Sequence, residues 1–172
     1  MIWVTSDTHF CHENIIRYEM RPFESVYEMN ERLIENWNAN VKVDDVVFHV
    51  GDFGLGREEH ILPIIKRLNG KITLIRGNHD DSLSKLLSLG FASVCDLLAL
   101  RYKHWELRFS HVPLEDLIYE DTSHGILNIH GHIHGKTRVS KNRINVSCDA
   151  WEYTPVTLEE ILIEYRKSRR LK

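Results

Sequence analysis

The segment Leu74-Ile75-Arg76-Gly77-Asn78-His79-Asp80 decides the fold expected for this sequence. An apolar run ends there, and an amide, an imidazole and a carboxylate follow almost at once. This pattern is typical of a strand that delivers polar side chains to a turn at its carboxyl end. Asn78 offers a carbonyl oxygen that suits a cation, and His79 with Asp80 beside it reads as a proton donor held by a carboxylate. The same residues also fit a plain Asx-type turn, so the other strand ends must decide.

Length and composition indicate a globular protein with one domain over residues 1–172. Hydrophobic residues make up 42% of the chain and charged residues 27%, which is ordinary for a folded domain with a full core. The formal net charge of −3 argues against a broad basic face, so we expect no stable nucleic-acid complex. A nucleotide substrate is still compatible with this charge, because a metal site can supply positive charge.

The three cysteines, Cys11, Cys95 and Cys148, show no C-x-x-C spacing. An odd set without that spacing indicates neither a disulfide framework nor a thiolate zinc site. The apolar start, Ile2-Trp3-Val4, is too short for a signal peptide, and no apolar stretch is long enough to span a bilayer. We therefore expect a cytoplasmic protein with no membrane partner.

Strands and helices alternate in the first half of the chain. Apolar runs predict strands, residues with a helical period predict helices, and Pro22 interrupts a loop that precedes the first helix. This order predicts a parallel sheet with right-handed crossovers. The expected strands are 2–5, 46–50 and 71–75, and the expected helices run near 26–41, 61–68 and 82–89.

From Phe91 onward the pattern changes to strands without helices between them. Residues 105–110 alternate apolar and polar side chains, as a half-buried antiparallel strand does. Further strands are expected at 125–129 and 143–147. Thr157 and Glu160 then form a capping box, which predicts a terminal helix with a basic end.

Five of the apolar runs end in residues that can bind metal ions. Residues two apart in an extended chain share a face, so Asp7 can act with His9, and His132 with His134. Because ligands of open α/β sheets bind outside the carboxyl ends of strands, we expect these side chains to meet. Their oxygen and nitrogen donors are too many for one ion and suit two ions about 3.5–4 Å apart. The set is Asp7, His9, Asp52, Asn78, His111, His132 and His134.

The other histidines fit ordinary positions. His49 lies inside an apolar run, where a core histidine is the better interpretation, and His130 belongs to a strand or supports a ligand. The remaining three, His60, His104 and His124, are expected at the surface.

These blocks resemble the calcineurin-like metallophosphoesterases, whose signature is Asp-x-His, Gly-Asp, Gly-Asn-His-Asp/Glu, a lone His and Gly-His-x-His, in that order. All five blocks are present between residues 7 and 134. The resemblance implies a four-layer α/β/β/α sandwich of two mixed β-sheets flanked by helices, with Asp52 bridging two divalent ions. It assigns Asp7, His9 and His134 to the first ion, and Asn78, His111 and His132 to the second.

The resemblance also implies a reaction. Two cations would prepare a bridging hydroxide for in-line attack on a phosphoester, and His79, oriented by Asp80, would act as the general acid. His12, in the loop after His9, is the best further candidate for contacting substrate. The expected cofactors are two divalent metal ions, with manganese first and iron, zinc or nickel as alternatives.

Departures from the family pattern narrow the substrate. Phe53-Gly54-Leu55-Gly56-Arg57 follows Gly51-Asp52 where protein phosphatases have Asp-Arg-Gly, and Asp80 stands where they have Glu, which disfavours a phosphoprotein. Arg57 reads as an exposed residue at a helix start. A phosphodiesterase acting on a small or nucleotide-like diester is therefore the first expectation. The alternatives are a phosphomonoesterase with the same site and a non-catalytic scaffold, like the retromer subunit with this fold.

Overall fold

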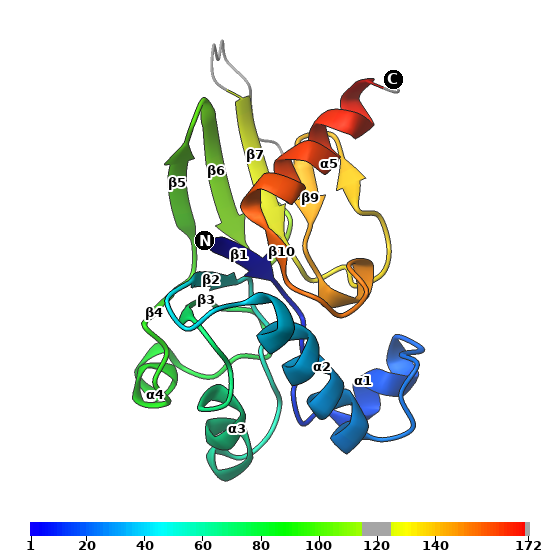
Figure 1. Cartoon of the computed structure of the whole chain (residues 1–172), viewed down its shortest axis with the longest axis vertical. Helices are drawn as coiled ribbons and strands as arrows, with labels where there is room; N and C mark the ends of the chain where they lie inside the picture. The colour runs from blue at the N-terminus through cyan, green and yellow to red at the C-terminus, as the bar shows by residue number, and fades with distance from the viewer. Residues whose placement is uncertain (115–124, 171–172) are drawn as a thin grey trace.

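The computed structural model describes residues 1–114 and 125–170, and in these residues two five-stranded sheets lie face to face (Figure 1). The first sheet has the order β10-β1-β2-β3-β4, in which β1 to β4 are parallel and β10 is antiparallel to β1. The predicted parallel sheet is therefore confirmed. Its strands are β1 (Ile2–Thr5), β2 (Val46–His49), β3 (Lys71–Ile75), β4 (Ser93–Cys95) and β10 (Val156–Thr157).

The second sheet has the order β5-β6-β7-β9-β8 and is mixed. Its strands are β5 (Leu98–Tyr102), β6 (Trp105–Ser110), β7 (Gly125–His130), β8 (Val139–Ser140) and β9 (Arg143–Asn145). The sequence predicted β6 as an antiparallel strand, and the structure corrects this in part, because β6 is antiparallel to β5 but parallel to β7. With β7 also parallel to β9, three strands of this sheet point their carboxyl ends the same way.

Two hydrophobic cores hold these layers together. The first lies under the first sheet and takes Met29, Leu33 and Trp37 from one helix and Ile61 and Ile64 from the next. The helices on this side are α1 (Glu13–Tyr18), α2 (Val26–Asn40), α3 (Glu58–Ile65) and α4 (Leu83–Ser88). Figure 1 shows them gathered beside β1 to β4. Within the described residues, none of the helices is both long and apolar enough to cross a bilayer.

The second core lies between the sheets. Val4 and Ile75 of the first sheet pack in it with Phe109 and Ile129 of the second, and α5 (Leu158–Arg170) contributes Ile161 among others. The predicted class, two mixed β-sheets flanked by helices, is confirmed. Both cores consist mainly of apolar side chains, and several of the buried polar residues, among them Asp7, Asp52 and His111, follow the ends of strands.

Two short helical elements were not predicted, and strands β4, β5, β8 and β10 were given no ranges from the sequence. Residues 13–18 were read as loop but form α1, and Cys148–Ala150 form a 3₁₀ turn, η1, after β9. η1 is too short for periodicity to reveal, and Ile15 is the one buried residue that α1 has, so no apolar stripe marks that helix. The capping box is confirmed, because the Glu160 amide donates to Thr157 Oγ1 at 3.2 Å and the Thr157 amide donates to Glu160 Oε2 at 2.8 Å.

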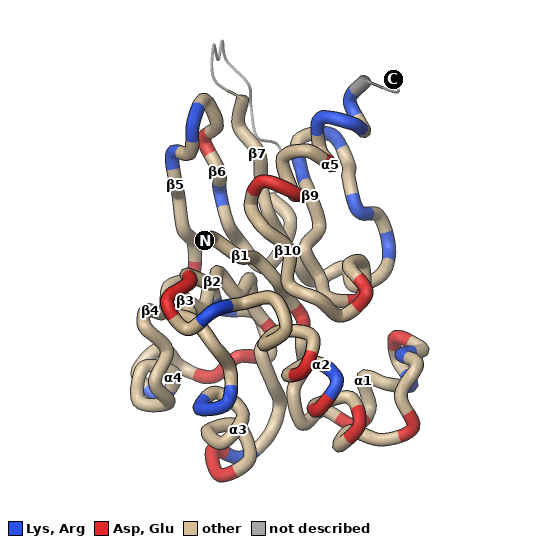
Figure 2. Tube along the Cα trace, in the orientation of Figure 1, with Lys and Arg blue, Asp and Glu red and all other residues tan. Residues whose placement is uncertain are grey.

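Those residues set aside in the sequence that the structure describes lie where they were expected. His49 is fully buried, while His60 and His104 are exposed. Arg57 is exposed at the N-cap of α3. His124 lies outside the described residues. Figure 2 shows acidic and basic residues along most of the chain, with basic ones gathered at the end of α5.

Candidate metal centre

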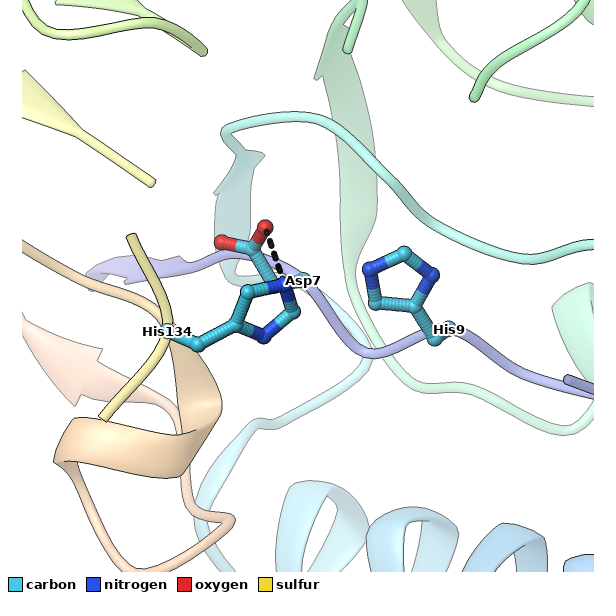
Figure 3. A group of neighbouring side chains, drawn as sticks. All are labelled: Asp7, His9 and His134. Carbon is cyan, nitrogen blue, oxygen red and sulfur yellow. Dashed lines mark ion pairs between the residues drawn. The ribbon is translucent and has the colours of Figure 1, made fainter. Parts of the chain in front are cut away.

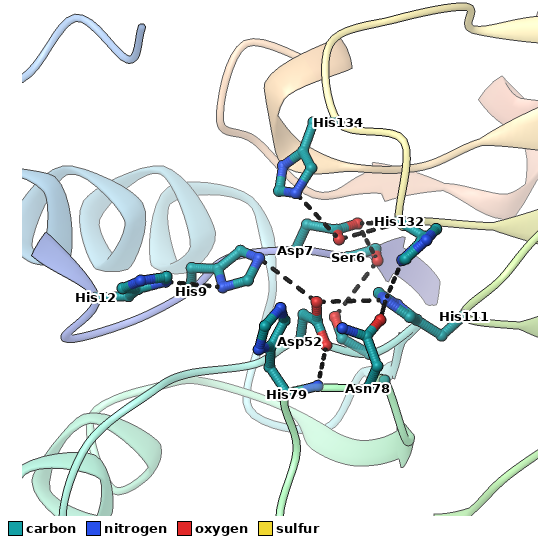
Figure 4. Close-up of polar contacts among 12 residues, drawn as sticks. Ser6, Asp7, His9, His12, Asp52, Asn78, His79, His111, His132 and His134 are labelled. Atoms are coloured by element: carbon teal, nitrogen blue, oxygen red, sulfur yellow. Dashed lines mark hydrogen bonds and ion pairs between the residues drawn. The ribbon is translucent and has the colours of Figure 1, made fainter. Parts of the chain in front are cut away.

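The carboxyl ends of both sheets meet at one place. The chain after β1 and the chain after β9 form an isolated parallel bridge between Ser6 and Ser147, and the Cys148 amide donates to the Ser6 carbonyl at 2.9 Å. The turns after β2, β3, β6 and β7 lie around this bridge. Figure 4 shows the resulting cluster of carboxylates and imidazoles, which come from five separate parts of the chain.

Asp7, His9 and His134 form the first group of donors (Figure 3). One oxygen or nitrogen atom from each lies within 4.8 Å of the others. His134 Nε2 is 4.0 Å from Asp7 Oδ1, and the His9 and His134 rings stack at 5.3 Å. Asp7 and His9 are buried, and His134 is partly exposed. The group is therefore buried at Asp7 and His9 and partly exposed at His134.

The second group surrounds the Nε2 atom of His111. Asp52 Oδ2 lies 3.3 Å from this atom, Asn78 Oδ1 lies at 3.1 Å and His132 Nδ1 at 3.3 Å. The other ring nitrogen, Nδ1, is 2.9 Å from the Val50 carbonyl, which can only accept a hydrogen bond. That contact turns the His111 ring so that Nε2 faces the cluster.

Asp52 connects the two groups. Its Oδ2 atom is 3.6 Å from His9 Nε2 in the first group and 3.3 Å from His111 Nε2 in the second. The other oxygen, Oδ1, accepts a hydrogen bond from the His79 amide at 3.0 Å. One carboxylate oxygen thus faces both groups while its partner fixes the side chain.

The backbone conformation that brings the ligand-type residues to the cluster differs from the one predicted from the sequence. Alternation in a strand was expected to put Asp7 with His9 and His132 with His134. Instead, these residues follow the strands, and all four adopt left-handed backbone conformations with φ between 49° and 70°. Such conformations cost about 1–3 kcal/mol each for non-glycine residues and concentrate at functional sites. Asp7 and His9 thus lie in one group, whereas His132 and His134 lie in different groups, and strand alternation accounts for neither result.

Two glycines of the motifs allow the close approach. Gly51 has φ +89°, and a Cβ there would overlap the His111 ring. A Cβ on Gly131 would overlap Ser6 Oγ and the Asp7 carboxylate. Glycine at these two positions lets the turns of the two sheets touch at the cluster.

The pKa shifts of the carboxylates and imidazoles show that the cluster favours positive charge. Burial raises the pKa of Asp7 to about 6, against the opposing effect of His111. Burial would also lower the pKa of His111, but its hydrogen bond with Asp52 and the charges of both carboxylates raise that pKa to about 9. Positive charge on the His111 ring is thus favoured by the two carboxylates beside it. A bound cation meets the same demand.

A further observation indicates that the donor set suits divalent metal ions. His9 Nε2 is buried and has no hydrogen-bond partner within the described residues. Burial lowers the pKa of His9 to about 3, so the imidazole is neutral and keeps a lone pair on one of its ring nitrogens. Buried polar atoms in native proteins are almost always paired, and a nitrogen facing a carboxylate is satisfied by a metal ion. Mixed carboxylate, amide and imidazole donors suit manganese, iron, zinc and nickel.

The two residues expected beside the metals, His79 and His12, are exposed and half-buried, respectively, and mark the open side of the cluster. The exposed His79 ring is 5.7 Å from the His9 ring. The half-buried His12 lies 6.5 Å from His79 by ring centroids, and its Nδ1 is 3.4 Å from His9 Nδ1. Figure 4 shows both rings on the His9 side of Asp52.

The expected role of Asp80 is corrected. Asp80 was predicted to orient the His79 imidazole, but in the described structure its carboxylate accepts backbone hydrogen bonds. The Asp52 and Gly77 amides donate to Oδ2 at 2.8 and 2.7 Å, and the Phe53 amide donates to Oδ1 at 3.0 Å. Asp80 therefore ties the turn after β2 to the turn after β3.

Sequence reasoning missed Arg21 and Asp149. Asp149 Oδ2 lies 3.0 Å from His134 Nδ1, and Arg21 forms a buried ion pair with Asp149. Asp149 follows β9, so the rule that found the other carboxylates past strand ends would have found it too. Arg21 lies between α1 and α2 in no motif, and its sequence carries no signal for this contact. Ser6, whose hydroxyl donates to Asp7 Oδ2 at 2.5 Å, was also missed.

The comparisons with known proteins agree with this geometry. The sequence profile of the calcineurin-like phosphoesterase family matches residues 1–167. An uncharacterized protein of Methanocaldococcus jannaschii is 35% identical over 170 residues, which cover 94% of this chain and 89% of that protein. The gene 66 protein of Mycobacterium phage L5 is 29% identical over 181 residues, covering 87% of this chain and 86% of that protein.

A solved structure supports the fold. A protein of unknown function from Aquifex aeolicus superposes with a TM-score of 0.76 at 28% identity, over 94% of this chain and 97% of that one. The profile match spans nearly the whole chain, including every residue of both donor groups. The chain belongs to the calcineurin-like phosphoesterase family.

Proposed function

We propose that this protein is a dinuclear-metal-dependent phosphoester hydrolase, and specifically a phosphodiesterase that acts on a small or nucleotide-like diester. The observation that carries the proposal is the position of Asp52 Oδ2, 3.6 Å from His9 Nε2 and 3.3 Å from His111 Nε2. A carboxylate oxygen shared between two groups of donors is what a pair of ions requires.

The residues divide between the two ions as follows. Asp7, His9 and His134 would hold one ion, Asn78, His111 and His132 would hold the other, and Asp52 would serve both. When bound, the two ions lower the pKa of a water molecule and offset the negative charge of the phosphate group. We propose manganese as the first candidate. This donor set does not discriminate strongly among divalent metal ions, so the availability of each metal decides which one is bound.

His79 would supply the proton that the leaving oxygen needs. Its amide is fixed by Asp52 Oδ1, and its ring is exposed on the open side of the cluster, where an ester substituent can reach it. General acid catalysis of this kind contributes about 10²–10⁴-fold to the rate. Asp80 would act on this step indirectly, by holding the turn that carries His79.

His12 would contact the substrate. Support comes from its half-buried ring, 5.3 Å from His9, and from the neighbouring ring of Tyr18, which lies 6.3 Å from His12 and is 68% exposed. Exposed rings beside the cluster offer a stacking surface to a planar substituent. This surface favours a nucleotide-like or aryl ester over a small alkyl one.

The test is a matrix of metals against substrates. Purified protein is freed of metal with a chelator, reloaded with Mn²⁺, Fe²⁺, Zn²⁺ or Ni²⁺, and assayed on an aryl phosphodiester and the matching monoester. We expect metal-dependent hydrolysis with the diester faster. The Asp52→Asn variant, assayed alongside, should lose activity and bind both ions weakly. A faster monoester identifies a phosphomonoesterase, and no hydrolysis with any metal identifies a binding scaffold, which would overturn the proposal.

A further inference from the structure

The buried pair of Arg21 and Asp149 is not explained by the donor groups themselves. Arg21 Nε donates to Asp149 Oδ1 at 2.8 Å and Nη2 donates to Oδ2 at 2.9 Å, a two-pronged ion pair. The Arg21 side chain is fully buried and that of Asp149 is 6% exposed. Replacing such pairs with apolar side chains is often neutral or stabilising, so stability alone does not account for one.

Asp149 fixes the ring of one candidate ligand. A carboxylate paired in this way can only accept hydrogen bonds, so His134 Nδ1, 3.0 Å from Asp149 Oδ2, must carry the proton. The lone pair is then on Nε2, the atom that lies 4.0 Å from Asp7 Oδ1. The Ser147 hydroxyl also donates to Asp149 Oδ2, at 3.2 Å, which holds the carboxylate in place.

Arg21 fixes the backbone that carries two more candidate ligands. Its Nη2 donates to the Asp7 carbonyl at 2.7 Å and its Nη1 donates to the Thr8 carbonyl at 2.9 Å. Asp7 and His9, on either side of Thr8, have φ values of 56° and 50°. Capture of these carbonyls compensates for a conformation that non-glycine residues disfavour. The guanidinium thus acts on the same group of donors as Asp149 does.

We propose that Arg21 and Asp149 form a positioning pair for the first group, Asp7, His9 and His134, and set its affinity for a metal ion. The inference rests on the proposed dinuclear function. The second group, around His111 Nε2, receives no described contact from either residue. Removal of the pair should therefore weaken the binding of the ion in the first group and leave the binding of the ion in the second group unchanged.

The experiment is a titration of Mn²⁺ into metal-free protein by isothermal titration calorimetry. The variants are Asp149→Asn, which removes the charge at nearly constant shape, and Arg21→Lys, which keeps a charge but loses the planar fork. The control is Glu152→Gln, a nearby carboxylate whose side chain is 93% exposed. Thermal unfolding of each variant shows whether it is folded, and Arg21→Lys carries the test where Asp149→Asn does not fold.

We expect wild type and Glu152→Gln to bind two ions alike. In Asp149→Asn and Arg21→Lys one ion should lose about 10–100-fold in affinity, as is usual when a residue supporting a ligand is changed. Folded variants that bind both ions as wild type does, with only a lowered melting temperature, would show a purely structural pair and overturn the inference. Wild-type protein that binds no ion would instead overturn the proposed function.

Discussion

At the scale of single residues, position matters as much as chemical type. Asp52 acts through both oxygens, because Oδ2 faces the two donor groups while Oδ1 holds the His79 amide. His79 itself belongs to neither group, and its exposed ring faces the open side. The structure thus separates a residue that would bind ions from one that would handle a proton.

The His79→Ala variant tests this separation. We expect it to keep both ions, since no donor is lost, and to hydrolyse alkyl diesters about 10²–10⁴-fold more slowly. Aryl diesters should suffer less, because their leaving groups need less help from an acid. Steady-state rates on both esters, with metal content measured on the same samples, check the prediction. The His60→Ala variant, altered at an exposed histidine of α3, is the control. Equal rates for metal-replete His79→Ala and wild type would remove His79 from the mechanism.

Residue types were the part of the site that the sequence predicted well. Asp, Asn and His after apolar runs identify donors wherever the strands lie, because the chemistry belongs to the side chain. The role of Arg21 could not be predicted, since it depends on a packing position between α1 and α2 that no local pattern encodes. The role of Asp80 was mistaken for a related reason. Adjacency in sequence suggested a contact with His79, whereas the turn directs the carboxylate to backbone amides.

At the scale of elements, Asp80 joins the turns that follow β2 and β3. Its two oxygens accept from amides of both turns, and burial raises the pKa of its carboxyl group in spite of these bonds. The two turns carry Asp52 and Asn78. A change at Asp80 should therefore move donors of the cluster without touching them.

The Asp80→Asn variant should show this effect. The amide has one acceptor oxygen in place of two, so at least one buried backbone amide loses its partner, at a cost of about 1–3 kcal/mol in unfolding free energy. Urea denaturation measures that loss. Activity in the His79→Ala background gives the sharper comparison. If Asp80 works through the turns, Asp80→Asn should slow that variant further. If it worked through the His79 imidazole, the second change would have no effect.

The start of α5 offers a second test at this scale. The reciprocal bonds of Thr157 and Glu160 satisfy amides at the first turn of a helix that contributes to the intersheet core. Thr157→Ala should lower the unfolding free energy by about 1 kcal/mol. Glu160→Gln should keep most of the stability, because glutamine also serves in a capping box. Urea denaturation of both variants checks the pair, and equal losses would contradict the capping role.

The elements themselves divide by the strength of their apolar pattern in how well the sequence predicted them. The long helices and the buried strands of the first sheet follow from periodicity and apolar runs. The six-residue helix α1, with one buried residue, and the 3₁₀ turn η1 have no such signal, and η1 carries Asp149. The pairing of β6 with β7 also lay beyond the sequence, because alternation describes the exposure of a strand and not the direction of its neighbours.

At the scale of the whole molecule, the candidate centre depends on two sheets whose carboxyl ends meet. The first sheet brings Asp7, Asp52 and Asn78, and the second brings His111 and the His132/His134 turn. Topology predicted the first half of this arrangement, since parallel strands end at one edge. The joining of the sheets through the Ser6 and Ser147 bridge could not be predicted, because it pairs segments that neither periodicity nor motif connects.

The molecule also buries a neutral histidine in the first core, next to the cluster. His49 is fully buried, its Nε2 lies 3.0 Å from Thr8 Oγ1, and its ring contacts those of Trp37 and Phe53. Burial lowers the pKa of His49 to about 3 from its ordinary 6.5. Between these two values the unfolded chain holds a proton that the folded protein excludes. The free energy of unfolding therefore falls as pH falls below 6.5.

The His49→Phe variant should reduce this acid sensitivity of the fold. The phenyl ring keeps the packing against Trp37 and Phe53 but cannot bind the proton. In wild type this one histidine contributes about 1.4 kcal/mol per pH unit well below pH 6.5. Urea denaturation from pH 7.5 to pH 5, with a chelator present so that metal release plays no part, should give His49→Phe a slope shallower by about one proton. The exposed-site variant His60→Gln should keep the wild-type slope. Equal slopes for His49→Phe and wild type would mean that the folded protein protonates His49 as readily as the unfolded chain does.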